Sequence, residues 1–505
     1  MSTLPTAMSL RDLLADTAIP AALGNIVVRG LQLDSRLIMP GDAFVALQGA
    51  HQHGITFAPT ALARGAQVIL AEAPAPVAFV PVTSAPVAAS ENQPVLWIEQ
   101  LRDQLGGIAS RFYGAPSAAM QVIGVTGTNG KTSTVQLLAQ ALSSAGLTTA
   151  SIGTLGAGVH GALRAGERTT PDVLSVHALF AEFRDEGASH VAMEVSSHAL
   201  DQGRVDAIAF DIAVFTNLTR DHLDYHGDMQ SYGAAKARLF AWPGLSCAVI
   251  NADDAFGREL LRHLPTSVSA LSYGIDATNA DIRASAIETS AHGLSFHLHT
   301  PWGEGAVESS LLGRFNIANL LAVIGCLGTL DFSFAQIQNA VAQLQPVAGR
   351  MNRLGGENAE PLIVVDYAHT PDALEQTLSN LRAHSAGRLI CVFGCGGERD
   401  QGKRPQMGAI AERLADVAIV TDDNPRGEDG DVIVAQILAG FSAPNNVTIE
   451  RNRAAAIALA IEQASSGDVV LIAGKGHEGY QEIGGRKLPF DDLQVARSVM
   501  EAHTC

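Results

Sequence analysis

The sequence predicts an α/β protein of three domains. A length of 505 residues accommodates roughly three domains. Along most of the chain, apolar runs of strand length alternate with helix-compatible stretches, which is typical of βαβ units and a largely parallel sheet. One of these runs leads through a glycine-rich turn into a helix, and several later runs end in polar tails. The prediction is therefore a central P-loop domain with a mostly parallel sheet, followed by a Rossmann-like C-terminal α/β domain.

The same pattern sets the expected boundaries. The first domain is expected at 1–101, where residues 74–96, rich in Pro, Ala, Val and Ser, are interpreted as a surface loop before the strand-like VLWIEQL. The central domain is expected at 102–345, with strands at QVIGVT, TTASIGT, HVAMEVS, DIAVFTN and CAVINAD. After a break at PVAGR, the C-terminal domain is expected at 346–505, with strands at PLIVVDYAH, RLICVFGCG, DVAIVTDDN and DVVLIAGKG.

Composition narrows the class of protein. The net charge of −18 disfavours nucleic acid or an anionic membrane as a partner, so an anionic substrate must be held by local basic groups. Five cysteines are too few for a disulfide framework and suggest a reducing compartment. The N-terminus has no signal-like region, and the longest apolar run, LLAVIGCLGTL, is too short to span a bilayer. A cytoplasmic protein is expected.

The segment QVIGVTGTNGKTSTVQLL, residues 121–138, is the most informative. Backbone N–H groups around Gly127 and Gly130 suit phosphate oxygens, and the positive end of the following helix favours them. Lys131 is expected to reach the outer phosphates and Thr132 to ligate Mg²⁺. The glycine spacing departs from the common P-loop pattern, and an ordinary glycine turn is the alternative. With Gly-Lys-Thr at this place, the sequence favours a site for ATP or GTP.

Polar residues follow the predicted strands, where open α/β sheets bind ligands. Glu194 ends HVAMEVS and either holds Mg²⁺ or caps the next turn. His222 and His226 have the spacing of two zinc ligands, but no glutamate adjoins the first, so a phosphate or Mg²⁺ neighbour is preferred. Lys236, judged by its surroundings in the sequence alone, reads as an ordinary helix lysine.

Two C-terminal motifs also leave alternatives open. Arg426 follows a proline, so its forked donors suit a two-point grip on a carboxylate. A plain Asp-Asn-Pro turn fits the same residues. Glu478, in GKGHE, either binds an ammonium or caps a helix. The central and C-terminal domains are expected to present their polar strand ends to a shared cleft.

Together these motifs resemble the Mur ligase family, ATP-dependent enzymes that add amino acids to the peptide of the peptidoglycan precursor. The motifs, in order, are DSR with PGDAFVALQG, GTNGKTS, MEVSSHAL, FTNLTRDHLDYHG, GRFNIAN, GRM, DYAHTPDAL, GERDQGKRP, DNPR and GKGHE. The likeness covers nearly the whole chain, and the unusual P-loop spacing is that of the family. It implies one domain for the UDP moiety, one for ATP and one for the incoming amino acid.

The resemblance also implies site residues, position by position. Contacts to the UDP-sugar are implied for Leu33, Ser35, His51, Gln52 and His53. Contacts to the muramoyl dipeptide are implied for Thr169, Thr170, Ser196, Gln202 and Arg204, although Arg168 stands where some relatives carry Asn. Contacts to the nucleotide are implied for Gly127, Thr128, Asn129, Gly130, Lys131, Thr132, Ser133, Asn316, Asp366 and His369.

Catalysis and metal binding are implied for a smaller set. Lys131, His222 and Lys236 would act in catalysis. Lys236 resembles a lysine carbamylated by CO₂, which becomes an anion able to hold Mg²⁺ together with Thr132, Glu194 and His222. ATP would convert the γ-carboxylate of D-glutamate into an acyl phosphate, which an amine then attacks. The protein's part is positioning and charge neutralisation.

The motifs are most similar to those of members that add meso-diaminopimelate to the UDP-linked muramoyl dipeptide. The residues implied to hold it are Arg399, Asp423, Asn424, Pro425, Arg426, Gly474 and Glu478. The nearest alternative is a lysine-adding member, and such members lack the arginine of DNPR. A P-loop phosphotransferase or ATPase is a less favoured alternative. A monomer is expected.

Overall fold

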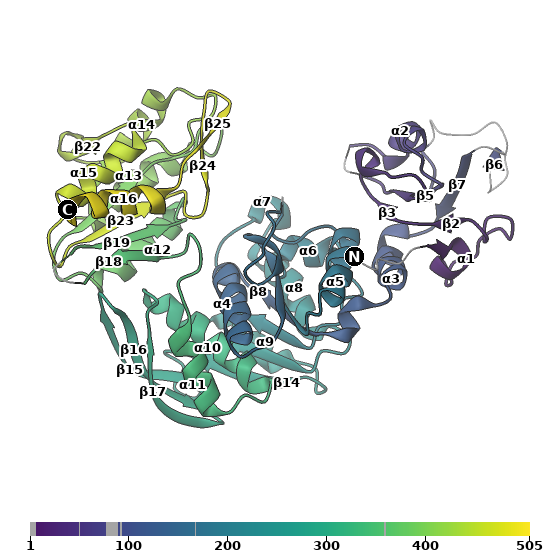
Figure 1. The fold of residues 1–505 in the computed structure, drawn as a ribbon, viewed down its shortest axis with the longest axis horizontal. Helices are drawn as coiled ribbons and strands as arrows, with labels where there is room; N and C mark the ends of the chain where they lie inside the picture. Colours follow the sequence, from purple (N-terminus) through teal and green to yellow (C-terminus); the bar gives the residue numbers. More distant parts are fainter. Residues whose placement is uncertain are drawn as a thin grey trace. The chain divides into compact units, whose positions relative to one another are not determined.

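The computed structural model describes residues 7–49, 51–76, 89–90, 93–166, 168–357 and 360–504. The chain divides into two compact units, Met1–Ser272 (unit 1) and Tyr273–Cys505 (unit 2) (Figure 1). The middle of the loop predicted at 74–96 lies outside the described residues, as do residues 1–6 and Cys505. No helix in the described part of the chain is long and apolar enough to cross a membrane.

Unit 1 opens with a small sheet in the order β3-β4-β5-β7-β6, parallel except at β6. Its strands are β3 (Leu31–Gln32), β4 (Ala43–Ala46), β5 (Val68–Glu72), β6 (Ala89–Ser90) and β7 (Gln93–Ile98). Beside it lie the β1 (Met8–Ser9) and β2 (Val27–Val28) pair and helices α1 (Leu10–Leu13), α2 (Ala58–Ala63) and α3 (Leu101–Phe112). The predicted loop is wrong at its end, because β6 and the start of β7 fall inside it.

The second sheet of unit 1 carries the glycine-rich turn. Its first six strands have the order β10-β9-β11-β8-β12-β13, of which only β10 is antiparallel, and the sheet continues through β14 into β15, β16 and β17, which lie within residues 269–309. The first six strands are β8 (Gln121–Thr126), β9 (Thr149–Gly153), β10 (Gly156–Val159), β11 (His190–Glu194), β12 (Ile212–Phe215) and β13 (Cys247–Asn251). The five strands predicted here are confirmed.

Helices cover both faces of this second sheet, which explains why its strands read as almost unbroken apolar runs. In Figure 1, α4 (Lys131–Ser144) lies on one side of β8, and α5 (Val173–Asp185) and α6 (Ser197–Asp201) lie on the other. Phe180 and Phe183 of α5 pack in one core with Val122 and Met193 of the sheet. The remaining helices are α7 (Leu223–His226), α8 (Met229–Ala237) and α9 (Ala255–His263).

Unit 2 begins with an antiparallel ribbon that the sequence interpretation did not foresee. After β14 (Ser269–Gly274), it consists of β15 (Ile282–Ser290), β16 (Gly293–Thr300) and β17 (Gly303–Ser309). Helices α10 (Arg314–Thr329) and α11 (Phe334–Gln343) follow and lie beside the ribbon (Figure 1).

The C-terminal sheet of unit 2 has the order β18-β19-β23-β20-β21-β22, and only β18 is antiparallel. The strands are β18 (Asn352–Gly355), β19 (Leu362–Asp366), β20 (Leu389–Phe393), β21 (Val417–Val420), β22 (Thr448–Ile449) and β23 (Val469–Ala473). The four strands predicted here are confirmed. A hairpin of β24 (Tyr480–Ile483) and β25 (Arg486–Pro489) follows β23.

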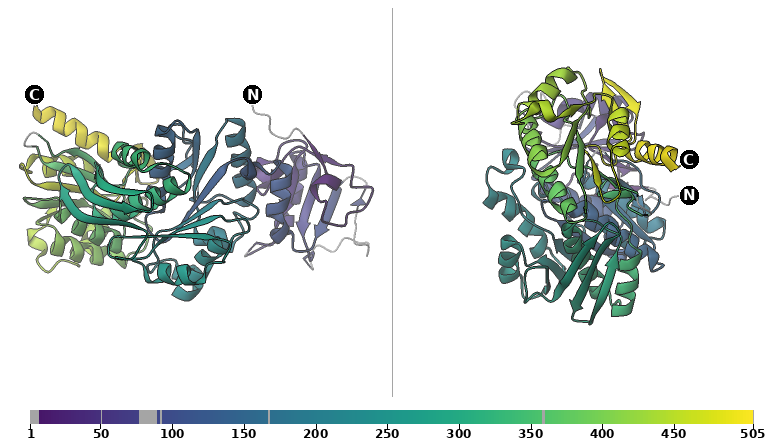
Figure 2. Two further views of the ribbon diagram at one scale, coloured as in Figure 1. Left: turned by 90° about the horizontal axis from the view of Figure 1, so that it is seen from below. Right: turned by 90° about the vertical axis from the view of Figure 1, so that its left-hand side faces the viewer.

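Separate apolar cores lie on the two faces of this sheet. Helices α12 (Pro371–Arg382), α13 (Lys403–Leu414) and α14 (Gly430–Leu438) contribute to one core, and α15 (Arg453–Glu462) and α16 (Asp492–Thr504) to the other. Helix-covered sheets are visible in both views of Figure 2. The predicted α/β class is therefore confirmed, whereas the boundaries expected after residues 101 and 345 stay predictions.

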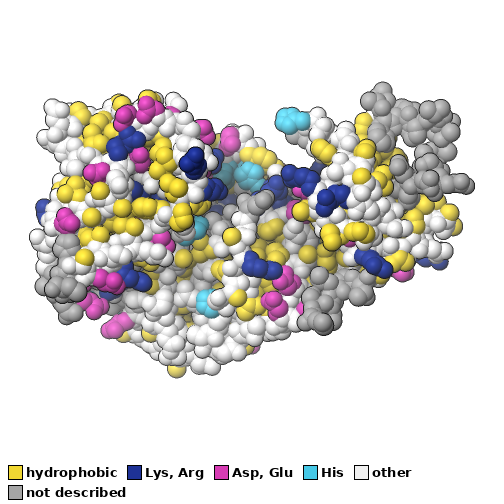
Figure 3. Space-filling model, turned by 45° about the horizontal axis from the view of Figure 1, so that its top comes forward, with side chains coloured by type: hydrophobic (Ala, Val, Ile, Leu, Met, Phe, Trp, Pro, Cys, Tyr) yellow, Lys and Arg dark blue, Asp and Glu magenta, His cyan; other side chains and the backbone are white. Residues whose placement is uncertain are grey.

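Basic side chains stand in small separate groups on the face drawn in Figure 3. They do not merge there into one continuous basic surface. With a net charge of −18, an anionic ligand would have to be bound by such local groups rather than by a broad positive field.

Candidate active site

The glycine-rich turn between β8 and α4 has the backbone geometry of a phosphate cradle. Gly127 (φ +146°) and Gly130 (φ +86°) adopt conformations that favour glycine. A Cβ on Gly127 would lie 1.9 Å from Thr216 Oγ1, so no other residue fits without movement. Lys131 Nζ donates to the carbonyls of Gly127 and Thr128 at 2.9 Å, which folds its ammonium over the turn. Helix α4 begins without a side-chain N-cap, which suits an anion there.

The segment after β12 holds this turn in place. Asn217 Oδ1 accepts a hydrogen bond from the Asn129 amide (2.9 Å), and the Asn217 carbonyl accepts one from the Thr128 amide (2.8 Å). Thr216 Oγ1 donates to the Asn129 carbonyl at 2.6 Å. The sequence interpretation assigned no role to these two residues. Their place at the end of a strand beside β8 was the signal that could have identified them.

Lys236, on α8, is not an exposed helix lysine. It is 1% exposed, and its Nζ donates to the Gly127 carbonyl at 2.8 Å. Burial, reinforced by the charge of Lys131, lowers the pKa of Lys236 well below its usual range. A lysine with a depressed pKa is available as the neutral amine, which is the form that reacts with CO₂. A buried lysine with a lowered pKa is not the ordinary helix lysine that its sequence surroundings suggested.

Glu194 ends β11 and is 1% exposed. Its Oε1 accepts from the Thr154 amide (2.7 Å) and its Oε2 from Thr154 Oγ1 (3.3 Å), so it caps the turn after β9. This turn lies 40 residues before Glu194 and is not the next turn that the sequence interpretation considered, and the capping leaves acceptor capacity on the carboxylate for a cation. Thr132, which is 7% exposed, stands in the first turn of α4.

His222 immediately precedes the short helix α7, and its backbone is left-handed (φ +52°). Its ring lies 4.8 Å from the ring of His198. Among the described residues, neither His222 nor His226 belongs to a group of three His, Cys, Asp or Glu side chains close enough to hold a metal ion together. Gly227 ends the helix. A shared role of Thr132, Glu194 and His222 as Mg²⁺ ligands stays a prediction.

The residues implied to hold the muramoyl dipeptide form one polar network beside Glu194. Thr170 Oγ1 donates to the Glu194 carbonyl (2.8 Å) and lies 3.4 Å from Ser196 Oγ. Arg204 donates to the Thr170 carbonyl and to Gln202 Oε1, both at 3.0 Å. Thr169 Oγ1 joins through Thr154 at 3.1 Å. The structure thus connects all five residues near Glu194, at the carboxyl end of β11.

The residues implied to contact the UDP-sugar follow β3 and β4, whose carboxyl ends share one edge of a parallel sheet. Leu33 and Ser35 come after β3, and His51 and Gln52, both exposed, come after β4. His53 is 5% exposed, and both of its ring nitrogens contact backbone groups. Its Nδ1 accepts from the Ile55 amide (3.0 Å), and its Nε2 lies 2.9 Å from the Glu72 carbonyl.

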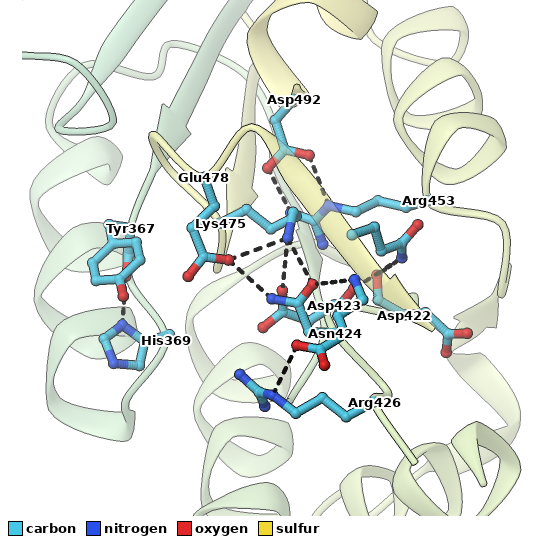
Figure 4. Close-up of polar contacts among 12 residues, drawn as sticks. Tyr367, His369, Asp422, Asp423, Asn424, Arg426, Arg453, Lys475, Glu478 and Asp492 are labelled. Atoms are coloured by element: carbon cyan, nitrogen blue, oxygen red, sulfur yellow. Dashed lines mark hydrogen bonds and ion pairs between the residues drawn. The ribbon is translucent and has the colours of Figure 1, made fainter. Parts of the chain in front are cut away.

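Unit 2 carries a charged cluster at the ends of β21 and β23. The ammonium of Lys475, which is 0% exposed, lies 3.2 Å from Glu478 Oε2, 3.0 Å from Asn424 Oδ1 and 3.7 Å from Asp423 Oδ1. Figure 4 shows this side chain directed toward Asn424 and Glu478. Two carboxylates thus surround one cation, which leaves one negative charge uncompensated. Asp423 Oδ1 is buried without a hydrogen-bond partner, so it suits a further ammonium donor.

Arg426 lies next to this cluster and carries a positive charge, whereas the cluster has one excess negative charge. Its Nη1 donates to the Gly397 carbonyl at 2.7 Å, and its Nε lies 3.6 Å from Glu482 Oε2. Its side chain is 20% exposed. A carboxylate of the hairpin therefore already pairs with the guanidinium that was predicted to bind a ligand carboxylate. Arg399, the other predicted grip, is exposed.

A buried ion pair fixes the strand end behind the cluster. Arg453 and Asp492 are fully buried and share two contacts of 2.7 Å. Arg453 Nη2 also donates to the Ala473 carbonyl at 3.0 Å, directly before Gly474 (φ +120°). Removing one partner of such a pair would leave the other charge buried and uncompensated. The sequence interpretation missed this pair, since its members stand 39 residues apart.

The three residues of unit 2 that were predicted to contact the nucleotide all make polar contacts with the backbone of unit 2. Asn316, which is 5% exposed, donates to the Leu312 carbonyl at 2.8 Å. Asp366 accepts from the amides of Met351 and Ala368, both at 2.9 Å, and burial raises its pKa. His369 Nδ1 lies 2.9 Å from the Tyr367 carbonyl, and burial lowers its pKa. Their contacts to a nucleotide stay predictions.

Lys475 and Glu482 are the main site residues that sequence reasoning missed. Lys475 stands inside the GKGHE motif, and a lysine directly after an apolar strand was the available signal. Glu482 had no comparable signal, because the hairpin alone brings it to Arg426.

Comparisons with known proteins assign the chain to a family. Three family models match it, described as "Mur ligase family, catalytic domain" at residues 27–113, "Mur ligase middle domain" at 125–327 and "Mur ligase, glutamate ligase domain" at 349–476. They agree with a fold that has N-terminal, middle and C-terminal domains.

Individual relatives match nearly the full length. The UDP-N-acetylmuramoyl-L-alanyl-D-glutamate–2,6-diaminopimelate ligase of Xanthomonas campestris is 58% identical over 99% of this chain and 98% of its own. The protein of the same name from Pseudomonas aeruginosa is 51% identical over 96% of this chain and 97% of its own. A solved structure with that name is 37% identical, with a TM-score of 0.75, covering 99% of this chain and all of that one. The chain therefore belongs to the Mur ligase family.

Proposed function

We propose that this chain is an ATP-dependent ligase that joins meso-diaminopimelate to the D-glutamate of UDP-N-acetylmuramoyl-L-alanyl-D-glutamate. The relatives that match almost its whole length carry the corresponding name. The observation that carries the proposal is the charge pattern at the ends of β21 and β23. Arg426 offers a cation, while Asp423 and Glu478 leave one negative charge beside Lys475. That pattern complements the distal carboxylate and ammonium of diaminopimelate.

The chemistry asks the chain to neutralise charge and to position two substrates. A carboxylate resists attack by an amine until its oxygen becomes part of a phosphate leaving group. Lys131 and the cradle at Gly127 suit the triphosphate of ATP. The Thr170 and Arg204 network suits the dipeptide, whose γ-carboxylate becomes the acyl phosphate. The amine of diaminopimelate then attacks, and phosphate leaves.

Lys236 fits the proposed carbamate on three grounds. It is buried, it touches the P-loop carbonyl of Gly127, and its depressed pKa favours the reactive amine. Carbamylation would replace this amine near Lys131 with an anion. The carbamate, Thr132, Glu194 and His222 would hold Mg²⁺, which neutralises phosphate charge when it is bound. We also propose that the protein works as a cytoplasmic monomer.

Phosphate release tests the function. The protein is supplied with ATP, Mg²⁺, the UDP-linked dipeptide and either diaminopimelate or lysine. We expect release only when all substrates are present, with diaminopimelate strongly preferred, and none from the Lys131→Ala variant. Equal use of lysine would favour the lysine-adding alternative. Phosphate release from ATP alone would favour a P-loop ATPase.

A further inference from the structure

We propose that the outer face of the β15–β17 ribbon binds a transition-metal dication of the zinc class through His297, His299 and Glu304. Both histidines stand on β16, and Glu304 stands on β17 directly opposite His299 (the ribbon is labelled in Figure 1). Among the residues that the structure describes, this is the one group of three His, Cys, Asp or Glu side chains close enough to hold an ion together. None of the three belongs to the proposed ligase site.

Strand alternation places the two imidazoles on one side of the ribbon. Phe296 and Leu298 are buried, so the alternating positions 297 and 299 face outward. The two rings lie 4.7 Å apart, centroid to centroid. A His-x-His pair on a central strand therefore presents two nitrogen ligands to the same point, without any helix to bring them together.

The distances suit one small cation. The candidate ligand atoms all lie within 4.8 Å of one another, and His299 Nδ1 lies 3.0 Å from Glu304 Oε2. Tetrahedral zinc with bonds of about 2.0–2.1 Å places neighbouring ligand atoms about 3.3 Å apart. His299 and Glu304 thus already stand near the required separation, and a rotamer adjustment of His297 would close the set.

The surroundings favour a metal ligand role for His299. Its Nε2 lies 3.0 Å from Ser285 Oγ, which can accept the ring N–H and leave Nδ1 directed at the Glu304 carboxylate. Metal-bound histidines commonly make such an outer hydrogen bond. Arg283, opposite His299 on β15, donates to the Thr278 carbonyl at 2.7 Å and is thereby held by the preceding turn. Two nitrogens and one carboxylate favour zinc, nickel or copper over Mg²⁺.

The alternative is an ion pair between His299 and Glu304 that binds no metal, and a titration separates the two. Full-length protein without nucleotide is titrated with Zn²⁺ against a chromophoric chelator, and with Co²⁺ while its visible absorption is recorded. We expect one ion per chain and the absorption of a histidine-ligated cobalt ion. The His297→Ala/His299→Ala variant should bind Zn²⁺ at least about tenfold more weakly.

A matched control lies in the same ribbon. His292, exposed in the turn between β15 and β16, is outside the group, so His292→Ala should bind Zn²⁺ like the parent. Glu304→Gln keeps the side-chain shape and should weaken binding while retaining the cobalt absorption of two imidazoles. The proposal is overturned if the parent binds no Zn²⁺, or if the double variant or Glu304→Gln binds it as tightly as the parent. With all substrates present and Mg²⁺ as the only added metal, phosphate release should be unchanged in all three variants. This result would separate the zinc site from the ligase reaction.

Discussion

Replacing Arg426 with glutamine should remove the preference for diaminopimelate over lysine. Glutamine ends near the position of the arginine Nε, so it loses the 2.7 Å contact of Nη1 with the Gly397 carbonyl, and the folding of the loop after β20 has to be checked. The positive charge and the fork of donors are lost. Since lysine differs from diaminopimelate by the absent distal carboxylate, only the diaminopimelate reaction should suffer.

The size of the effect follows from the burial of the guanidinium. With a side chain 20% exposed, Arg426 is neither fully solvated nor fully enclosed. A hydrogen bond to a charged group in such a setting contributes about 1.5–3 kcal/mol. The value of kcat/KM for diaminopimelate should therefore fall about 10- to 150-fold, and the value for lysine should stay near that of the parent.

The assay is phosphate release at varied concentrations of each amino acid, with ATP and the UDP-linked dipeptide saturating. Thermal unfolding of the variant checks that the loop is intact. A variant that uses diaminopimelate with the parent's kcat/KM would refute the assignment of Arg426 to the distal carboxylate. An equal loss for both amino acids would show that the residue supports the site as a whole instead.

Further predictions concern the neighbouring groups. Glu482→Gln removes the carboxylate that pairs with the Arg426 guanidinium and would compete there with the distal carboxylate of diaminopimelate. The KM for diaminopimelate should therefore fall, and a higher KM would contradict this competition. Lys236→Met should slow phosphate release by about 10²–10³-fold, and labelled bicarbonate should give a carbamate NMR signal in the parent alone. Gly127→Ala should abolish ATP binding measured by calorimetry, because its Cβ would meet another residue at 1.9 Å, whereas Gly107→Ala, with open space around it, should bind ATP normally. His384 Nε2 accepts from a backbone amide at 2.9 Å, and burial lowers its pKa. The unfolded chain therefore binds the proton more readily, and the stability that this histidine contributes is present above about pH 6.5 and lost as the pH falls. The melting temperature of His384→Gln should accordingly depend less on pH over that range than the melting temperature of the parent.

The parallel strands and the glycine-rich turn could be predicted because their signals are local. A strand buried on both faces needs an unbroken apolar run, and a phosphate cradle needs glycine where a Cβ would collide. The antiparallel β15–β17 ribbon was missed because its half-buried strands alternate polar and apolar residues within a region interpreted as βαβ units. Periodicity predicted strands and helices, and most of the site residues were identified from the family motifs.

By itself, then, the sequence determined the α/β class, the main parallel strands of the central and C-terminal sheets and the place of the P-loop. Tertiary structure alone decided the chemistry of particular side chains. Lys236 reads as an ordinary helix lysine until the fold buries it and brings the charge of Lys131 near it, and these two effects depress its pKa. The Lys475 cluster and the pairing of Glu482 with Arg426 likewise depend on strands that meet only in the fold. The physical reason is that propensity and periodicity act over a few residues, whereas burial and charge pairing depend on which distant segments pack together.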